Sequence, residues 1–78
     1  MIVSNKARLR PNELVEIDNE VFRVMDESEL PASWVSRAVK NTKTLIALES
    51  LIQKDVLVVV CSRVRVLNAL EAIVAIAG

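Results

Sequence analysis

The chain has 78 residues, ten basic and ten acidic, so its formal net charge is zero. With one cysteine and no histidine, it excludes an intramolecular disulfide, nearly excludes a structural zinc site and lacks the side chain most used in acid–base catalysis. We therefore expect one small domain without catalytic residues, cofactor or metal. Such a domain buries only about 60–65% of its unfolded surface. Because 53% of the residues are apolar, we expect it to gain stability by association.

The charged residues are unevenly distributed. Residues 11–30 contain seven acidic side chains against one base, Arg23, whereas the rest of the chain has an excess of bases. This run is typical of a solvated hairpin face; alternatively, it is the acidic side of a dipolar subunit that meets a basic side of its neighbour. A neutral chain with few aromatic residues lacks the basic surface of nucleic-acid-binding proteins, so nucleic acid is not an expected partner.

Neither a targeting segment nor a membrane span is expected. The first ten residues place three bases after a very short apolar pair, unlike a signal peptide. No apolar run approaches the ~20 residues of a transmembrane helix. Together with the free thiol, this pattern favours a cytoplasmic site of synthesis.

Residues 14–25 predict a β-hairpin. Apolar and polar residues alternate in both halves, and the sequence DNE at 18–20 suits a tight turn because Asp and Asn tolerate left-handed backbone. Pro11 and the following asparagine separate this hairpin from an extended stretch expected at 2–9.

Residues 26–41 predict a helix. Ser28 or Glu29 is suited to cap it, Pro31 fits its first turn, and acidic residues are favourable near its positive end. Its apolar stripe consists of Leu30, Trp34, Val35, Ala38 and Val39. We therefore expect the tryptophan in the core of the domain rather than at an interface.

Residues 42–54 predict a second helix and residues 56–61 a buried strand. The apolar residues at helical spacing in the first segment are Leu45, Leu48, Leu51 and Ile52. The second segment, VLVVVC, has the length and β-branching of a strand. Its Cys61 is interpreted as a core residue, because no histidine is present to act as its base. Valines alternate with Arg63 and Arg65 in 62–67, so the strand either continues or turns back.

Residues 68–78 predict a C-terminal helix that is apolar nearly all round. Asn68 and Glu71 have the spacing of a capping box, and Gly78 is a natural end. Such a helix needs burial on more than one side, which so small a domain hardly provides. We therefore interpret it as an assembly element added to a domain at 1–67. The expected interface residues are Leu70, Ile73, Val74 and Ile76.

These elements predict a small single α+β domain. An antiparallel hairpin and a Val-rich strand pack on two short helices, and the C-terminal helix is swapped, protruding or folded back. The expected core is Val15, Ile17, Phe22, Val24, Trp34, Val39, Leu48, Leu51, Ile52, Leu57 and Val59.

Four segments in order, RLRPNELVEI (8–17), SWVSRAVKN (33–41), LIALESLIQKD (45–55) and VLVVV (56–60), carry a resemblance to a known type of protein. They resemble a short module of small structural proteins from Mu-like and other tailed bacteriophages and prophages. The resemblance implies a strand pair, a tryptophan-bearing helix, a Leu/Ile-rich helix and a Val-rich strand. It also implies a tail or head accessory protein, located in the virion, that acts through protein contacts. This chain lacks the usual Pro or Gly in the helix break.

The leading hypothesis is a non-enzymatic structural subunit that self-associates or docks in a larger assembly through its last helix. The alternative is a regulatory module that recognises a protein or nucleic acid through Arg63 and Arg65, the candidate polar contacts. A third hypothesis is a non-catalytic subunit of an enzyme.

Overall fold

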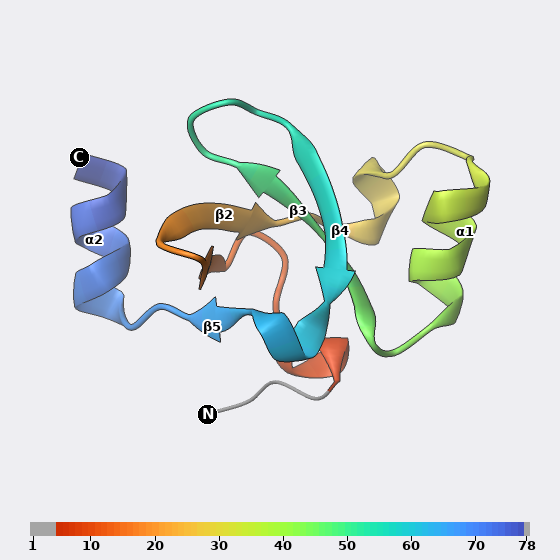
Figure 1. Cartoon of the computed structure of the whole chain (residues 1–78), viewed down its shortest axis with the longest axis horizontal. Helices are drawn as coiled ribbons and strands as arrows, with labels where there is room; N and C mark the ends of the chain where they lie inside the picture. Colours follow the sequence, from red (N-terminus) through yellow and green to blue (C-terminus); the bar gives the residue numbers. More distant parts are fainter. Residues whose placement is uncertain (1–4, 78) are drawn as a thin grey trace.

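The computed structural model describes residues 5–77, which form strands, α-helices and one-turn 3-10 helices (Figure 1). The strands are β1 (Leu14–Ile17), β2 (Glu20–Val24), β3 (Leu45–Ser50), β4 (Val56–Val60) and β5 (Arg65–Val66). The helices are α1 (Trp34–Asn41) and α2 (Ala69–Ala77), and the 3-10 turns are η1 (Lys6–Arg8), η2 (Glu27–Glu29) and η3 (Cys61–Arg63). The strands form one antiparallel sheet of order β4-β3-β2-β1-β5, so the predicted α+β class is confirmed.

The predicted hairpin is formed by β1 and β2. Ile17 lies opposite Glu20, which leaves Asp18 and Asn19 as a two-residue turn. Their φ angles are 49° and 67°, the left-handed values that a type I′ turn requires at both positions. The turn sequence and the alternating apolar residues therefore favour the same register.

The extended stretch expected at 2–9 is wrong for its described part. Residues Lys6–Arg8 form the 3-10 turn η1, and the Asn5 side chain caps this turn by accepting a hydrogen bond from the Ala7 amide. Residues 2–4 lie outside the described residues. The turn delivers Leu9 to the core, where it is 7% exposed.

The helix predicted at 26–41 begins later than expected. Asp26, not Ser28 or Glu29, is the first cap, and it closes a capping box around η2 with Glu29. The α-helix starts only at Trp34, after Ser33, whose hydroxyl accepts a hydrogen bond from the Ser36 amide. The capping residues Asp26 and Ser33 therefore begin two separate elements, η2 and α1. The apolar stripe had predicted one continuous helix over both.

The second helix predicted at 42–54 is wrong. Residues Leu45–Ser50 form β3, the strand that pairs with both β2 and β4. Ile46 and Leu48 point into the core, and Ala47 is buried on the other face, where α1 lies against β3. A strand that is covered on both faces has apolar residues on both faces, so its sequence does not alternate strictly between apolar and polar residues. Over a short stretch, such a pattern cannot be distinguished from the apolar spacing of a helix. The Leu/Ile-rich helix that the phage resemblance implied falls on this same segment.

The connection between β4 and β5 shows that the sheet is strongly curled. These strands are at opposite edges, which lie about 19 Å apart in a flat five-stranded sheet. The chain from Val60 to Arg65 reaches only about 17 Å when fully extended, and most of it is coiled in η3. The sheet therefore closes partly into a barrel, and Cys61 and Val64 of the connection lie inside it, at 0% and 4% exposure.

The core lies inside this curl. Seven of the eleven predicted core residues are buried: Val15, Ile17, Phe22, Val24, Val39, Leu48 and Val59. The prediction is wrong for Trp34, Ile52 and Leu57, which are exposed, and for Leu51, which is half-buried. Buried apolar residues that it missed are Leu9, Ile46, Ala47 and Val64. The errors at Leu51, Ile52, Ile46 and Ala47 follow from the helix wrongly assigned to the segment that contains β3.

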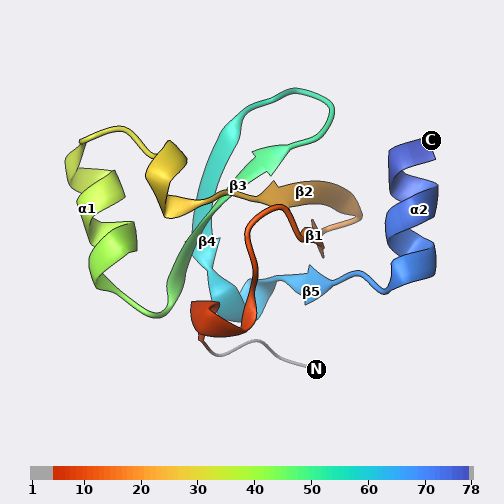
Figure 2. The same cartoon turned by 180° about the vertical axis from the view of Figure 1, so that it is seen from behind.

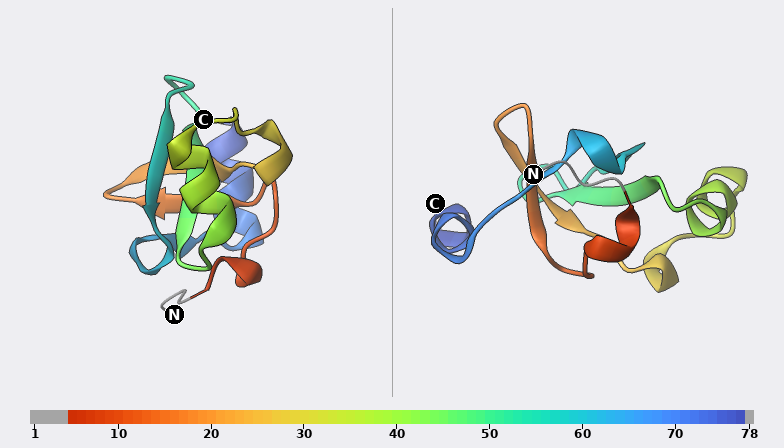
Figure 3. Two further views of the ribbon diagram at one scale, coloured as in Figure 1. Left: turned by 90° about the vertical axis from the view of Figure 1, so that its right-hand side faces the viewer. Right: turned by 90° about the horizontal axis from the view of Figure 1, so that it is seen from below.

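The two α-helices lie at opposite ends of the longest axis of the molecule. Figures 1 and 2 show α1 beyond one side of the sheet and α2 beyond the other. Seen from below in Figure 3, α2 stands apart from the barrel and is reached through β5. The C-terminal helix therefore protrudes, one of the three arrangements that the sequence left open.

Leu48 and Leu57 are directly opposed on β3 and β4 but differ in burial, at 0% and 40% exposure. We predict that Leu48→Ala lowers the free energy of unfolding by roughly 2–5 kcal/mol, because it leaves a cavity in a packed core. Leu57→Ala should lower it clearly less. Urea unfolding of both variants measures this difference, and equal losses would show that the core does not lie where the structure has it.

Candidate assembly surface

The start of α2 is held by the capping box expected from the sequence. The Asn68 side-chain oxygen accepts a hydrogen bond from the Glu71 amide at 2.8 Å, and the Asn68 amide donates to the Glu71 carboxylate at 3.2 Å. The Leu67 amide donates to the carbonyl of Leu14, so the sheet pairing continues almost to the helix. The N-terminus of α2 is therefore fixed relative to β1. The predicted end at Gly78 lies outside the described residues.

Arg65 joins the sheet to α2. Its guanidinium donates to Glu16 of β1 at 3.1 Å and, through two nitrogens, to both carboxylate oxygens of Glu71 at 2.8 and 3.2 Å. The hydrogen bonds from Arg65, with the backbone bond from Asn68, lower the pKa of Glu71. In turn, the hydrogen bonds to Glu71 and Glu16 raise the pKa of Arg65. This candidate polar contact is thus occupied by two carboxylates of its own chain.

Arg63, the second candidate polar contact, is held more loosely. Its guanidinium lies 3.8 Å from the carboxylate of Asp18, and 59% of its side chain is exposed. The structure thus separates the two arginines that the sequence had grouped, because they lie on either side of the turn into β5.

The four predicted interface residues are all exposed on α2. Leu70, Ile73, Val74 and Ile76 are 63–74% exposed, while the half-buried positions of the helix are Glu71, Ala72 and Ala75. At 100° per residue, the four aliphatic side chains spread over roughly 160° of the helix circumference. The small and charged residues face the domain, and the large apolar ones face outward. This is the reverse of an ordinary surface helix.

A shallow groove separates α2 from the hairpin. Its volume is about 390 Å³, and it is lined on the α2 side by Leu70, Val74 and Ala75 and on the other by Val21 and Leu67. Glu16 and Glu71, the two ion-pair partners of Arg65, also line it. The groove and the outer side of α2 form one apolar surface, which we call the α2 surface.

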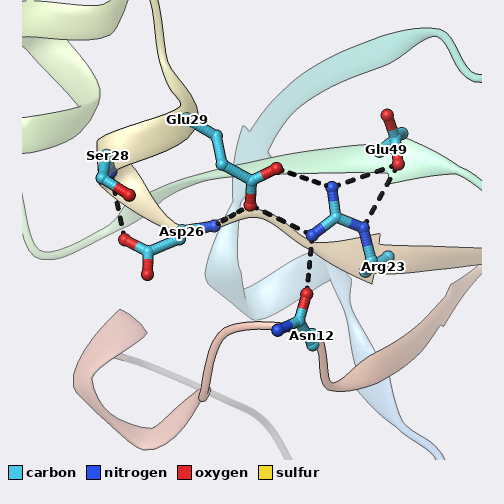
Figure 4. A network of polar contacts seen from close by, with 6 residues as sticks. All are labelled: Asn12, Arg23, Asp26, Ser28, Glu29 and Glu49. Atoms are coloured by element: carbon cyan, nitrogen blue, oxygen red, sulfur yellow. Dashed lines mark hydrogen bonds and ion pairs between the residues drawn. The ribbon is translucent and has the colours of Figure 1, made fainter.

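Most acidic residues of the 11–30 block are bonded within the chain. Arg23 is the centre of the largest group, where its guanidinium lies between Glu29 at 2.9 Å and Glu49 at 3.1 Å and also donates to Asn12 (Figure 4). Outside this group, Glu16 bonds to Arg65 and Glu27 to Lys6. The block is therefore not a free acidic surface awaiting a basic neighbour.

The hydrogen bonds from Arg23, with that from the Asp26 amide, lower the pKa of Glu29 to about 2. Glu29 in turn raises the pKa of Arg23. Figure 4 shows how this carboxylate joins η2 to β2, while Asp26 accepts from the Ser28 amide to complete the turn. The group holds the segment that precedes α1.

A pocket beside Lys6 has a structural explanation. Its volume is about 420 Å³, and it lies between η1, η2, β3 and α1 with Lys6 in its lining. The Lys6 ammonium donates to Glu27 at 2.6 Å and to the Val39 carbonyl, so it is engaged in joining these elements. Within residues 5–77, no group of three or more His, Cys, Asp or Glu residues is placed to hold a metal ion.

Cys61 is a core residue, as expected. It is 0% exposed, and its thiol donates to the carbonyl of Thr44 at 3.1 Å. Burial raises the pKa of this thiol. A protonated, enclosed thiol is a poor nucleophile.

No protein-family model, curated protein or solved structure matches the chain. In the part of the chain that the structure describes, neither helix is long and apolar enough to cross a membrane.

The Arg23–Glu29 pair generates a pH prediction. Because the pKa of Glu29 falls from 4.5 to about 2 on folding, the pair stabilises the fold fully above about pH 4.5 and progressively less as the pH falls toward 2. Glu29→Gln should therefore flatten the pH dependence of the urea unfolding midpoint over this interval. Arg23→Gln should flatten it as well, since it removes the cation. Parallel curves for wild type and Glu29→Gln would contradict the lowered pKa.

Proposed function

We propose that this protein is a non-enzymatic structural subunit that self-associates through the α2 surface. The observation that carries the proposal is the orientation of α2: its four large aliphatic side chains face outward at 63–74% exposure. A contiguous apolar surface of this kind usually marks an interaction site.

A second copy of the chain is the occupant that the energetics support. In a two-fold contact, eight such side chains are withdrawn from water, each worth roughly 1–2 kcal/mol at its present exposure. Association costs about 4–15 kcal/mol, so this contact is sufficient for a concentration-dependent dimer but leaves no large surplus. The groove beside α2 adds to the area, because aliphatic side chains of the other copy's α2 can enter it.

The charge arrangement supports this proposal over the regulatory alternative. A phosphate or acidic partner at Arg65 has to displace Glu16 and Glu71, which already neutralise it. Arg63 remains more accessible, but one exposed arginine supplies little of the electrostatic attraction that nucleic-acid binding uses. The large exposed side chains of α2 and β4 are aliphatic, which favours protein contacts.

The setting that we propose is a larger assembly, with a phage tail or head as the specific case. This case depends on the resemblance to small structural proteins of tailed phages, and the location in a virion depends on it in the same way. If the chain is not of phage origin, we propose a cytoplasmic location. Self-association through α2 is independent of either setting.

The test compares the replacement of one exposed isoleucine of α2 with the replacement of an exposed isoleucine in another part of the chain. We predict that Ile73→Glu lowers the mean solution mass at a given concentration, measured by light scattering, because a carboxylate is placed on the contact. Ile52→Glu, at an 86% exposed isoleucine in the β3–β4 loop, is the matched control and should leave the mass unchanged.

Two outcomes are contrary to the proposal. If wild-type protein stays monomeric up to high concentration, or if both variants behave like wild type, the α2 surface does not join copies of the chain. Salt separates the hypotheses further, because an apolar contact persists at high salt, whereas binding through Arg63 and Arg65 weakens steeply.

A further inference from the structure

The edge strand β4 lacks the features by which proteins protect a sheet edge. It lies at one end of the strand order and consists of five residues, VLVVV, without charge, proline or glycine. Such edges are usually protected by lysine, proline, a bulge or very short length. β5, at the other edge, has the last of these, since it is only two residues long. β4 is therefore open to pairing with another strand.

The pairing of β4 with β3 determines which of its backbone groups are free. The Cys61 amide donates to the Thr44 carbonyl at 2.7 Å, and the Ser50 amide donates to the Asp55 carbonyl at 2.9 Å. Since hydrogen-bonded pairs alternate along an antiparallel ladder, Leu57 and Val59 also bond to β3. The N–H and C=O groups of the other three residues point to the free edge; these residues are Val56, Val58 and Val60.

The outward N–H and C=O groups of these three residues are complementary to the same groups of a second copy. We propose that β4 pairs antiparallel with β4 of a second copy about a two-fold axis at Val58, a contact separate from the α2 surface. In this register Val58 lies opposite Val58 of the other copy, and Val56 lies opposite Val60. All six outward N–H groups of the two strands then find a carbonyl partner. A register shifted by one residue pairs none of them in this way, so the pattern selects one register.

The charges at the ends of β4 are complementary in the same register. Asp55 precedes the strand, and Arg63 follows it in η3. Antiparallel pairing places Asp55 of each copy opposite Cys61 of the other, beside the turn that holds Arg63. Within residues 5–77 Asp55 forms no ion pair, and the Arg63 pair with Asp18 is long and exposed. Each dimer thus has two opposite-charge contacts at its ends, which favour a second copy as the occupant.

The side chains of β4 benefit from the same contact. Leu57 faces the core at the open edge of the sheet and is still 40% exposed, while Val56 and Val60 are 55% and 44% exposed on the outer face. A paired strand covers both sets. Head-to-tail pairing of β4 on β5 provides only two residues of ladder, so the isologous pair is the favoured arrangement.

Val60→Pro tests the contact with little change to the monomer. Val60 has φ −73°, close to the value that proline requires, and its N–H points away from β3. By symmetry the substitution removes two of the six hydrogen bonds and should weaken dimerisation through β4 about tenfold or more. Val60→Thr keeps the N–H and the side-chain shape, so it is the matched control and should dimerise nearly as wild type.

Hydrogen exchange of single amides identifies the register. At concentrations where the chain associates, the amides of Val56, Val58 and Val60 should exchange about tenfold or more slowly than in dilute protein. The amides of Leu57 and Val59 should be protected in both samples, since they bond to β3. In Val60→Pro the concentration-dependent protection at Val56 and Val58 should be lost.

Several results overturn the proposal. Free exchange of the three outward amides in associated protein does so, as does association of Val60→Pro equal to that of Val60→Thr. Protection that appears only when another protein is added shows a foreign strand on β4. If Val60→Pro does not fold, Val56→Lys replaces it, because it places a charge at an already exposed position of the same edge.

The β4 contact and the α2 contact are distinguished by combining variants. Measurements in the Ile73→Glu background report β4 pairing alone. A mass lowered by Val60→Pro but not by Ile73→Glu supports the β4 contact and contradicts the α2 contact, and the reverse result contradicts β4. If each variant lowers the mass and the double variant is monomeric, both contacts exist.

Discussion

The structure depends on the short connection by which the chain passes from one edge of the sheet to the other. Four residues, Cys61 to Val64, join β4 to β5, and they allow β5 to reach β1 only because the sheet is curled. Their side chains at 61 and 64 fill the interior of the curl. The same connection places Arg65 between Glu16 and Glu71, which determines where α2 begins. This one connection thus contributes to the core, closes the curled sheet and positions the protruding helix α2.

Local sequence signals were sufficient where a single interaction determines an element. The Asp18-Asn19 turn requires left-handed backbone, and the Asn68–Glu71 capping box marks a helix start, so the hairpin and α2 were predicted correctly. β3 was not predictable in this way. Its apolar residues serve two faces and two neighbouring strands, and only the tertiary pairing with β2 and β4 distinguishes such a stretch from a helix. Trp34 was predicted in the core because it belongs to the apolar stripe of a helix at 26–41. The α-helix begins only at Trp34, and this side chain is 75% exposed.

The candidate site was predictable in composition but not in geometry. The excess of apolar residues in the last segment indicated Leu70, Ile73, Val74 and Ile76, and the structure has all four exposed. The ion pairs of Arg65 join residues as far apart as Glu16 and Glu71, a separation at which sequence patterns carry no signal. The free edge of β4 was likewise hidden, since VLVVV predicts a strand buried on both sides, and its edge position follows only from the sheet order.

The distribution of charge and apolar surface explains why the two proposed contacts use backbone groups and aliphatic side chains. Ten acidic and ten basic residues make the chain neutral, and several of the acids are already bonded to arginine or lysine of the same chain. With no net charge, the chain has little long-range attraction for a charged partner. Two isologous contacts on different parts of one subunit either close into a tetramer or continue as an open chain. The relative direction of α2 and the β4 axis decides between them, and Arg65 fixes the direction of α2 at its first turn.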